Sequence, residues 1–588
     1  MAFQDFDLLT EQKRIEKERK LKKKIAIGIV VGVVVVAAVV AFVCMDLNNP
    51  GNAETEKPTK KTEDKNNEVT KSSKMAKTIC ASTDYKAACE KSLGKVIHSN
   101  PSQKHQPKDL LKASISIISN ELDKAMNQQS KLKLDTPTEK EAFEVCEKVI
   151  GDAKQEINSS ATTVGGKDIG SLDSRKHDLS NWLSAVMSYQ QTCVDSFPKG
   201  DTQTAMKKAL QDSEELTSNA LAIVSQLSSI LSSIQKPKRR LLSDSKQPHE
   251  DNSATWMNAE ERRMLRVDPP KQKPDVTVAK DGSGDFKTIN DALNKVPQNH
   301  QGRYVIFIKE GVYEENVIVT KKMTNITIFG DGSLKTIISG SKNNVDGVPT
   351  YKTATFAAEG DGFMAQSLSF RNTAGPEKHQ AVALRVQSDR SIFLNCRMEG
   401  YQDTLYVQAH RQFYRGCYIA GTVDFIFGDA AAILQNCLIY IRKPMDGQKN
   451  TVTAQGRSDK RETTGLVLQN CHIMADDELS PEKQNFRSYL GRPWKAYSRT
   501  IVMETEIDDV IDPQGWLPWE GKFALSTLFY AEYNNKGAGS DVKRRVNWPG
   551  FKVIKKDQAL KYTVGQFING DSWLKGDVGT PVRFDLFS

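Results

Sequence analysis

Hydrophobic residues follow three different patterns along the 588-residue chain. The first is an apolar run over residues 25–45 that contains no charged side chain. Between residues 75 and 235, apolar residues recur at three- and four-residue steps, which places them on one face of an α-helix. From residue 275 onward, short runs rich in β-branched and aromatic residues are separated by Gly, Asn and Asp, as is typical of β-strands. The patterns predict a membrane-spanning segment, an all-α domain and an all-β domain, in that order.

The apolar run at residues 25–45 is long enough to cross a bilayer core of roughly 30 Å as a helix. Eight Lys or Arg residues lie between Lys13 and Lys24, and none lies between Ile25 and Pro50. This asymmetry places residues 1–24 in the cytosol and the rest of the chain across the membrane. A cleavable signal peptide is the alternative, but the long run without a small-x-small exit favours an uncleaved signal anchor. In either case the folded part is exported.

Two polar segments separate the predicted parts. Residues 46–74 contain mainly Lys, Glu, Thr and Asn, which predicts a disordered tether. Residues 236–274 form a second linker with two similar tetrapeptides, RRLL and RRML. A single basic pair is commonly a solvated charge run, but two copies in an exposed linker of an exported chain favour sites for a processing protease. The residues of the two motifs are Arg239, Arg240, Leu241, Leu242, Arg262, Arg263, Met264 and Leu265.

The all-β region repeats with a period near 20 residues. The fragments LNC, RGC, QNC and QNC recur with cysteine spacings of 21, 20 and 34. One short strand cluster per period, without intervening helices, indicates a parallel β-helix. Residues at matching positions of successive coils would then lie about 4.8 Å apart. Cys417 and Cys437 would therefore lie within reach of a disulfide.

The same stacking brings two aspartates together. Asp403 follows Cys396 by seven residues, and Asp424 follows Cys417 by seven. These acids could be ordinary turn residues facing solvent. However, the surrounding GYQDTLY and VDFIFG are rich in aromatic and β-branched residues, and low polarity and mutual repulsion favour the neutral form of at least one acid. Two carboxyl groups whose pKa values differ supply an acid and a nucleophile or base.

Three further residues are candidates for the same site. Gln380 and Gln402 are 22 residues apart, close to one coil, so their amides can converge near the carboxylates. In LGRPW, Arg492 lies two residues before Trp494. Arg492 could form a surface ion pair, yet beside one acid it would keep that acid ionised, while Trp494 offers a flat face for a sugar ring.

Composition narrows the partners and the chemistry. The net charge of +9 suits nucleic acid, anionic lipid or a carboxylated polysaccharide. With the chain predicted to be exported, we expect no nucleic-acid partner. The cysteines form no CxxC cluster and the histidines no Ser/His/Asp arrangement with a GxSxG elbow. We therefore expect neither a metal nor an organic cofactor.

Five motifs in the second half carry a family resemblance. GVYEENV, QAVALRV, GYQDTLY, GTVDFIFGDA and LGRPW together make residues 275–588 similar to plant pectin methylesterases. Residues 75–235, with their cysteines and NWLSAVMSYQQTC, resemble the pectin methylesterase and invertase inhibitor domain. The resemblance implies a multidomain chain in which an all-α four-helix-bundle inhibitor-like domain precedes a right-handed parallel β-helix. It also implies that the helical domain is an autoinhibitory or folding pro-region.

The resemblance further implies hydrolysis of galacturonate methyl esters in cell-wall pectin, with release of methanol. It makes Asp424 the nucleophile and Asp403 the general acid and base. Gln380 and Gln402 would stabilise the negative carbonyl oxygen, and Arg492 would hold Asp424. The substrate contacts implied are Thr350, Gln380, Arg492 and Trp494.

Covalent features and partners follow from the same comparison and from local motifs. The resemblance implies three disulfides: Cys80 with Cys89, Cys146 with Cys193, and Cys417 with Cys437. Two sequons, NSS at Asn158 and NIT at Asn325, predict glycosylation sites. The expected partners are methyl-esterified pectin, a processing protease, a separate inhibitor protein acting on the mature enzyme, and the membrane through the N-terminal segment. The mature enzyme is expected to be secreted to the cell wall.

Two other readings stay open. The chain could be a pectin-binding or inhibitor protein whose catalysis is dispensable, or a β-helix pectin lyase or glycosidase. A glycosidase needs an acid pair that flanks the glycosidic bond and has no use for paired amides beside a carbonyl. Released methanol, as opposed to shortened chains, separates these possibilities.

Overall fold

The computed structural model describes residues 60–99, 101, 105–128, 132, 134–166, 172–227, 273–298, 300–574 and 582–587. Residues 68–588 belong to one compact unit that contains both the helical region and the β-region. The predicted membrane segment at residues 25–45 and both basic motifs lie outside the described residues. Among the helices that are described, none is long and apolar enough to cross a membrane.

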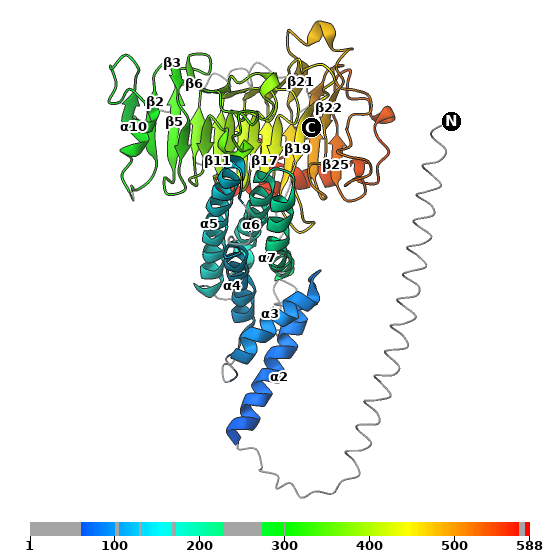
Figure 1. Cartoon of the computed structure of the whole chain (residues 1–588). Coiled ribbons are helices and arrows are strands. Elements are labelled where there is room, and N and C mark those ends of the chain that lie inside the picture. Colours follow the sequence, from blue (N-terminus) through cyan, green and yellow to red (C-terminus); the bar gives the residue numbers. More distant parts are fainter. Residues whose placement is uncertain are drawn as a thin grey trace, which may run out of the picture. The chain divides into compact units, whose positions relative to one another are not determined.

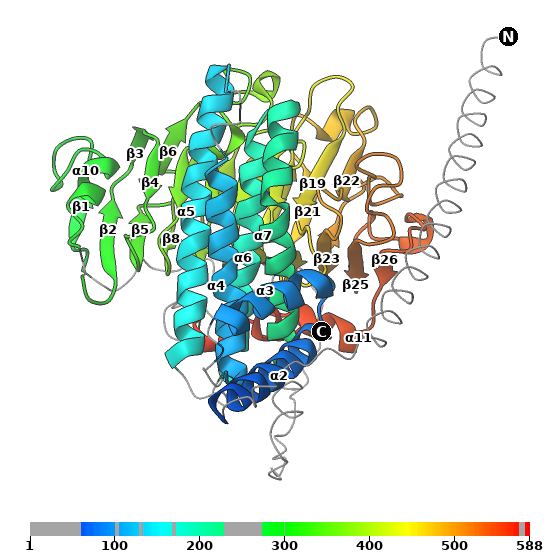
Figure 2. The ribbon, with the colours of Figure 1, turned by 60° about the horizontal axis from the view of Figure 1, so that its bottom comes forward.

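The first half of the described chain is helical. Helices α4 to α7 lie side by side (Figure 2), and their apolar faces meet in a buried core. Ile118, Val149, Leu183 and Leu221, one from each of the four, are fully or almost fully buried. The helices are α2 (Lys60–Cys80), α3 (Lys86–Ser99), α4 (Pro107–Met126), α5 (Pro137–Gly166), α6 (Lys176–Ser196) and α7 (Asp201–Ser225).

Part of the predicted tether is helical, so that prediction was wrong for residues 60–74, which belong to α2. The segment lacks large apolar residues, but it continues into Ala76, Ile79 and Cys80, which are buried against the other helices. Packing of these buried residues stabilises α2, whose polar N-terminal part would not form a stable helix alone.

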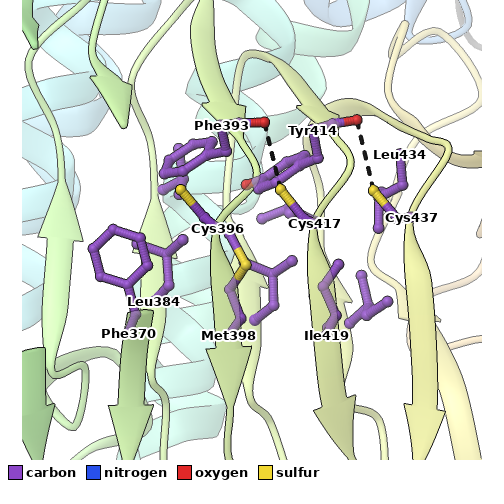
Figure 3. Close-up of a cluster of buried hydrophobic side chains, with 14 of the residues drawn as sticks. Phe370, Leu384, Phe393, Cys396, Met398, Tyr414, Cys417, Ile419, Leu434 and Cys437 are labelled. Atoms are coloured by element: carbon purple, nitrogen blue, oxygen red, sulfur yellow. Dashed lines mark hydrogen bonds between the residues drawn. The ribbon is translucent and has the colours of Figure 1, made fainter. Parts of the chain in front are cut away.

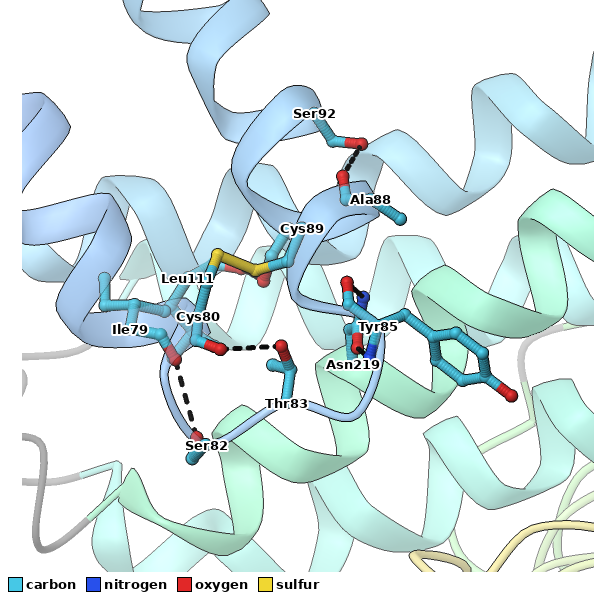
Figure 4. The surroundings of a disulfide bond; sticks show 11 residues. Ile79, Cys80, Ser82, Thr83, Tyr85, Ala88, Cys89, Ser92, Leu111 and Asn219 are labelled. Atoms are coloured by element: carbon cyan, nitrogen blue, oxygen red, sulfur yellow. Dashed lines mark hydrogen bonds between the residues drawn. A yellow bond between two sulfur atoms is a disulfide. The ribbon is translucent and has the colours of Figure 1, made fainter. Parts of the chain in front are cut away.

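Two disulfides fasten the helical region, as predicted. Cys80–Cys89 joins the end of α2 to α3 (Figure 4), and Cys146–Cys193 joins α5 to α6. Beside the first bridge, Asn219 of α7 accepts a hydrogen bond from the backbone N–H of Tyr85 at 3.1 Å and donates one to its carbonyl at 3.0 Å. The α2–α3 connection is thereby tied to the bundle.

The second half is a parallel β-helix, because successive strands rotate through three sheets whose neighbours all pair in parallel. Figure 1 shows the strands of successive coils stacked beside one another. The fold class predicted from sequence is therefore confirmed. One sheet contains β1 (Val276–Val278), β2 (Tyr304–Ile308), β5 (Ile326–Gly330), β8 (Met364–Gln366), β11 (Ser391–Leu394), β14 (Arg411–Arg415), β17 (Ala431–Gln435), β20 (Gly465–Gln469), β23 (Arg499–Met503), β25 (Phe529–Tyr533) and β26 (Phe551–Val553).

The other two sheets follow the same order along the chain. The sheet that carries the site contains β4 (Val317–Val319), β7 (Phe356–Ala358), β10 (Leu384–Val386), β13 (Leu405–Val407), β16 (Ile426–Gly428), β19 (Asn450–Gln455) and β22 (Ser488–Gly491). The third contains β3 (Gly311–Glu314), β6 (Thr336–Gly340), β9 (Ser369–Asn372), β12 (Arg397–Glu399), β15 (Tyr418–Gly421), β18 (Leu438–Ile441), β21 (His472–Ala475) and β24 (Glu506–Ile507). The short helix α10 (Ile289–Asn294) lies near the start of the β-region in sequence, and α11 (Lys556–Ala559) and α12 (Val564–Phe567) lie near the end of this region.

The predicted Cys417–Cys437 disulfide is absent: both residues are free, buried thiols, as are Cys396 and Cys471. The pairing of Tyr418 with Leu438 makes Cys417 and Cys437 neighbours in adjacent coils. Each thiol points at a carbonyl of the coil before it, Cys417 at Phe393 (3.4 Å) and Cys437 at Tyr414 (3.8 Å; Figure 3). Side chains stacked in register on parallel strands keep the strand spacing of about 4.8 Å, whereas a disulfide needs Cβ atoms roughly 3.5 to 4.5 Å apart.

Candidate active site

Asp403 and Asp424 occupy equivalent positions in adjacent coils. Leu405 of β13 pairs with Ile426 of β16, an offset of 21 residues (426 − 405), and the same offset relates Asp403 to Asp424 (424 − 403). Both aspartates have left-handed backbone conformations, with φ of 62° and 52°. Asp is one of the few residues other than glycine that adopt this conformation readily. The turns before two neighbouring strands thus bring the two carboxyl groups together, as the repeat predicted.

Asp424 is held by three hydrogen bonds to its carboxylate. Arg492, directly after β22, donates from Nε to Oδ1 at 2.8 Å and from Nη2 to Oδ2 at 2.6 Å. The Thr451 hydroxyl donates to Oδ1 at 2.6 Å, and the backbone N–H of Asp424 donates to the Thr451 oxygen at 2.8 Å. A bidentate guanidinium contact favours the ionised carboxylate and fixes its direction. Asp424 is therefore an oriented anion.

Asp403 is in a contrasting environment. Burial raises the pKa of its carboxyl group well above the usual range, and the negative charge of Asp424 raises it further, while Arg492 offsets part of the effect. The neutral, protonated form is favoured for Asp403. Two carboxyl groups of one residue type therefore stand beside each other as an anion and a proton donor.

A cavity of about 390 Å³ surrounds this pair. Its β-helix side brings together every residue that the sequence suggested for catalysis or substrate contact. Trp494 lies edge-on to Phe427, with ring centroids 5.9 Å apart, and so presents an aromatic wall. The β-helix residues that line the cavity are Thr350, Tyr351, Gln380, Gln402, Asp403, Tyr406, Asp424, Phe427, Ala454, Arg492, Trp494 and Trp519.

The helical domain closes the other side of this cavity. Helix α6 lies along β13: Asn181 contacts His410 at 3.0 Å, Ser188 donates to the carbonyl of Gln408 at 2.8 Å, and Thr192 meets the Tyr406 hydroxyl at 3.3 Å. Helix α6 thus covers β13 and the residues that follow it. The residues of the helical domain that line the cavity are Thr192, Asp195, Ser196, Phe197, Lys199 and Gln203.

Two residues at the site, Thr451 and Trp519, were not predicted from the sequence. Thr451 stacks on Asp424 at an offset of 27 residues, because the segment between β18 and β19 lengthens this coil beyond the regular repeat. Trp519 lies in a loop after β22, and the guanidinium of Arg492 packs 4.3 Å from the centre of its ring. No repeat or motif in the sequence marks either residue, since both come from irregular coils.

Metal-binding groups do not gather at this cavity. Within the described part of the chain, the one cluster of His and acidic side chains with suitable spacing is His472, Glu506 and Asp508. These residues lie on or next to β21 and β24 of a different sheet, and none lines the cavity. The chemistry available at the site is that of its own carboxyl, amide and guanidinium groups.

Comparison with known proteins places this geometry in a family. Residues 275–571 match the family model described as pectinesterase, and residues 74–223 match that of the plant invertase/pectin methylesterase inhibitor. An Arabidopsis thaliana protein named probable pectinesterase/pectinesterase inhibitor 13 is 52% identical over 520 residues, covering 87% of this chain and 82% of its own. Another from Arabidopsis thaliana, putative pectinesterase/pectinesterase inhibitor 45, is 48% identical over the full length of both chains.

A solved structure agrees with these sequence comparisons. The pectin methylesterase from carrot is 53% identical, with a TM-score of 0.53, and covers 54% of this chain and 100% of its own. A folded enzyme thus matches little more than half of this chain, without a counterpart for the remainder. By sequence and fold, the chain belongs to the pectinesterase family and carries an inhibitor-family domain ahead of the enzyme domain.

Proposed function

We propose that the β-helix hydrolyses the methyl esters of galacturonate units in pectin and releases methanol. One observation carries the proposal: an Arg-bound aspartate anion stands beside a buried aspartate with a raised pKa, in a cavity lined by two glutamine side chains. This arrangement supplies a nucleophile, a proton donor and hydrogen-bond donors for an oxyanion. The family membership and the names of the relatives support the same substrate.

In the first half of the reaction, a carboxylate oxygen of Asp424 attacks the ester carbonyl carbon. The carbonyl π electrons move to its oxygen, where the side-chain amides of Gln380 and Gln402 donate hydrogen bonds. When the tetrahedral intermediate collapses, the bond to the methoxy oxygen breaks and Asp403 gives that oxygen its proton. Methanol leaves, and the sugar carbonyl remains bonded to Asp424 as an acyl anhydride.

In the second half, the roles of Asp403 reverse. Its carboxylate, now ionised, takes a proton from a water molecule as the water oxygen attacks the sugar carbonyl carbon. The bond to Asp424 breaks, which restores the Asp424 carboxylate with its hydrogen bonds to Arg492 and leaves the sugar as a free acid. Asp403 is again protonated, so the cycle closes without a cofactor.

The test compares methanol release with chain length. Residues 273–588 are incubated with highly methylated pectin, and both methanol and the mass distribution of the polymer are followed. We expect methanol with unshortened chains. Shortened chains without methanol would favour a lyase or glycosidase, and neither change from a folded protein would favour a binding or regulatory role.

We further propose that the helical domain keeps the enzyme latent until the linker is cut. Support comes from the cover that α6 forms over β13 and from the six helical-domain residues that line the catalytic cavity. A polymer cannot reach Asp424 while this cover is in place. The full chain should therefore release methanol far more slowly than residues 273–588 at equal concentration, and equal rates would contradict latency.

Export and processing complete the proposal. The chain would enter the secretory pathway through residues 25–45, be cut at RRLL or RRML, and act in the cell wall, with glycosylation at Asn158 and Asn325. Both sequon residues are exposed in the structure. Replacing both basic pairs by Gln should leave an uncut chain inside the cell, whereas normal secretion of a cut enzyme would contradict the role of these motifs.

A further inference from the structure

Besides apolar contacts and neutral hydrogen bonds, the helical domain meets the β-helix through several carboxylates that face cations. In these pairs the acid belongs to the helical domain and the base to the enzyme domain; Lys148 with Glu359 is a pair of the opposite sense. At these contacts the covering domain presents carboxylates, the same groups that de-esterified pectin carries. The pairs are Asp84 with Lys460 and Arg461, Glu141 and Glu144 with Lys352, Glu156 with Lys321 and His410, Asp178 with Arg411, and Asp195 with Lys495.

The contact made by Glu156 of α5 is among the most deeply buried of these. The side chains of Glu156 and His410 are 6% and 1% exposed, and that of Lys321 is 15% exposed. Oε1 of Glu156 accepts a hydrogen bond from Nζ of Lys321 and lies 3.4 Å from Nε2 of His410. Nε2 of His410 has no hydrogen-bond partner among the described residues, although it is buried. A single carboxylate thus fills a place that the Lys321 ammonium group and the His410 imidazole of the enzyme domain define.

The remaining charges around this place are largely balanced within the enzyme domain. Asp389 is held by Arg411, which donates from Nε at 3.0 Å and from Nη2 at 2.6 Å. Asp361 accepts a hydrogen bond from the backbone of Asp389 at 3.1 Å, and burial beside Asp389 raises its pKa. Without Glu156, Lys321 and His410 therefore lose the carboxylate that contacts both of them directly.

This place lies at the far end of the covered strand from the catalytic pair. Asp403 directly precedes Thr404 and β13, whereas His410 follows that strand, seven residues later. At about 3.3 Å per residue for a fully extended chain, the separation is at most about 23 Å, because only residues 405–407 are strand. A stretch of a few sugar units can span such a distance. A polymer that replaced α6 along β13 would carry one unit at Asp403 and another at Lys321.

Resting on the proposed function, we propose that Lys321 and His410 form a subsite for the free carboxylate of a de-esterified galacturonate unit, and that Glu156 occupies this subsite until the helical domain leaves. A methyl ester has no charge to pair with an ammonium group, whereas a carboxylate does. The enzyme would therefore favour esters located several units from an already de-esterified one, and would retain its anionic product.

The experiment uses residues 273–588, whose main core is built from enzyme-domain residues alone and whose carrot counterpart is a free-standing chain. Unesterified oligogalacturonate, long enough to span the strand, is added as an inhibitor of methanol release. We expect Lys321→Met to raise the inhibition constant about tenfold and Lys321→Arg to stay within about threefold of the wild type. Lys322→Met, the exposed neighbour, is the matched control and should leave it unchanged.

A variant of His410 and a binding measurement test the subsite independently of Lys321 and of catalysis. His410→Gln should also weaken inhibition, and calorimetric titration with the same oligogalacturonate should show the same order of affinities without any reaction. Equal inhibition constants and affinities for the wild type, Lys321→Met and His410→Gln would overturn the subsite. If the wild type released no methanol, the proposed function would fail, but the binding titration would still decide the subsite.

Discussion

Two aspartates in equivalent coil positions differ in protonation because their neighbours differ. Asp424 receives two hydrogen bonds from Arg492 and one from Thr451, which favour its anion. Burial beside that anion raises the pKa of Asp403 and favours its neutral form. The chemistry of the site is thus decided by which residues reach each carboxyl group, and the repeat in the sequence gives only their positions.

Asp403→Asn should abolish activity while stabilising the enzyme domain at neutral pH. The pKa of Asp403 is raised in the folded protein. Its contribution to the free energy of unfolding is therefore complete below the pKa of 3.8 in the unfolded chain and is lost as pH rises through the raised pKa of the folded protein. The neutral Asn does not suffer this loss. Thermal unfolding of the wild type and variant should show the gain above pH 5 and not at pH 3, and a variant less stable at both would contradict the raised pKa.

Asp403 also sets the pH dependence of the wild-type rate. Its proton is needed for methanol to leave, so kcat should fall as pH rises through the raised pKa of Asp403. A rate profile that follows methanol release across this range checks the assignment. A profile flat on its alkaline side would mean that another group supplies the proton.

Thr451→Val should lower kcat about tenfold, since about 1.4 kcal/mol of stabilisation of the oriented Asp424 would be lost. Thr451 acts as a positioning residue, because it touches Asp424 and not the substrate in the proposed mechanism. Thr451→Ser keeps the hydroxyl and should restore most of the rate at an unchanged KM. Equal rates for the Val and Ser variants would show that the hydroxyl has no such role.

At the scale of elements, the regular coils were predictable and the irregular ones were not. The cysteine spacing of about 20 residues gave the period, the parallel stacking and the alignment of Asp403 with Asp424. It did not reveal Thr451, because the preceding coil is longer, or Trp519, which lies in a loop. Part of α2 was missed because tertiary packing at its buried end outweighs its polar composition.

The cysteine ladder of the β-helix gives a test at the same scale. Residues 273–588 contain four cysteines, all free and buried. Thiol titration should find none reactive in the folded domain and four after denaturation without a reductant. A total of two would mean that Cys417 and Cys437 form the disulfide that the family resemblance suggested.

Across the whole molecule, the contact between the two domains includes an acid and a histidine that are both charged in weakly acidic solution. Burial opposes the charges of both Glu156 and His410, but their mutual attraction lowers the pKa of Glu156 and raises that of His410. Lys321 adds to the shift of Glu156 and opposes that of His410. Asp389 and Asn181 also face or contact His410. Glu156 stays ionised below its ordinary pKa of 4.5, until the pH falls through its lowered pKa. His410 stays protonated above its ordinary pKa of 6.5, until the pH rises through its raised pKa.

Latency should therefore be strongest between about pH 4.5 and 6.5 and weaken as pH rises through the raised pKa of His410. The measurement is the methanol rate of the full chain divided by that of residues 273–588 at each pH. Glu156→Gln should raise this ratio several-fold within the window. His379→Gln, at an exposed histidine, is the control; a ratio independent of pH in every variant would contradict the account.

Methanol release from methylated pectin by residues 273–588, with and without Asp424→Asn, shows directly whether Asp424 is the nucleophile. We expect the wild type to release methanol and the variant to fall by at least about a thousandfold, because no nucleophile remains. Asp446→Asn, at an exposed loop residue, should retain the wild-type rate. Sustained release by a folded Asp424→Asn variant would contradict the claim that Asp424 is the nucleophile of a pectin methylesterase.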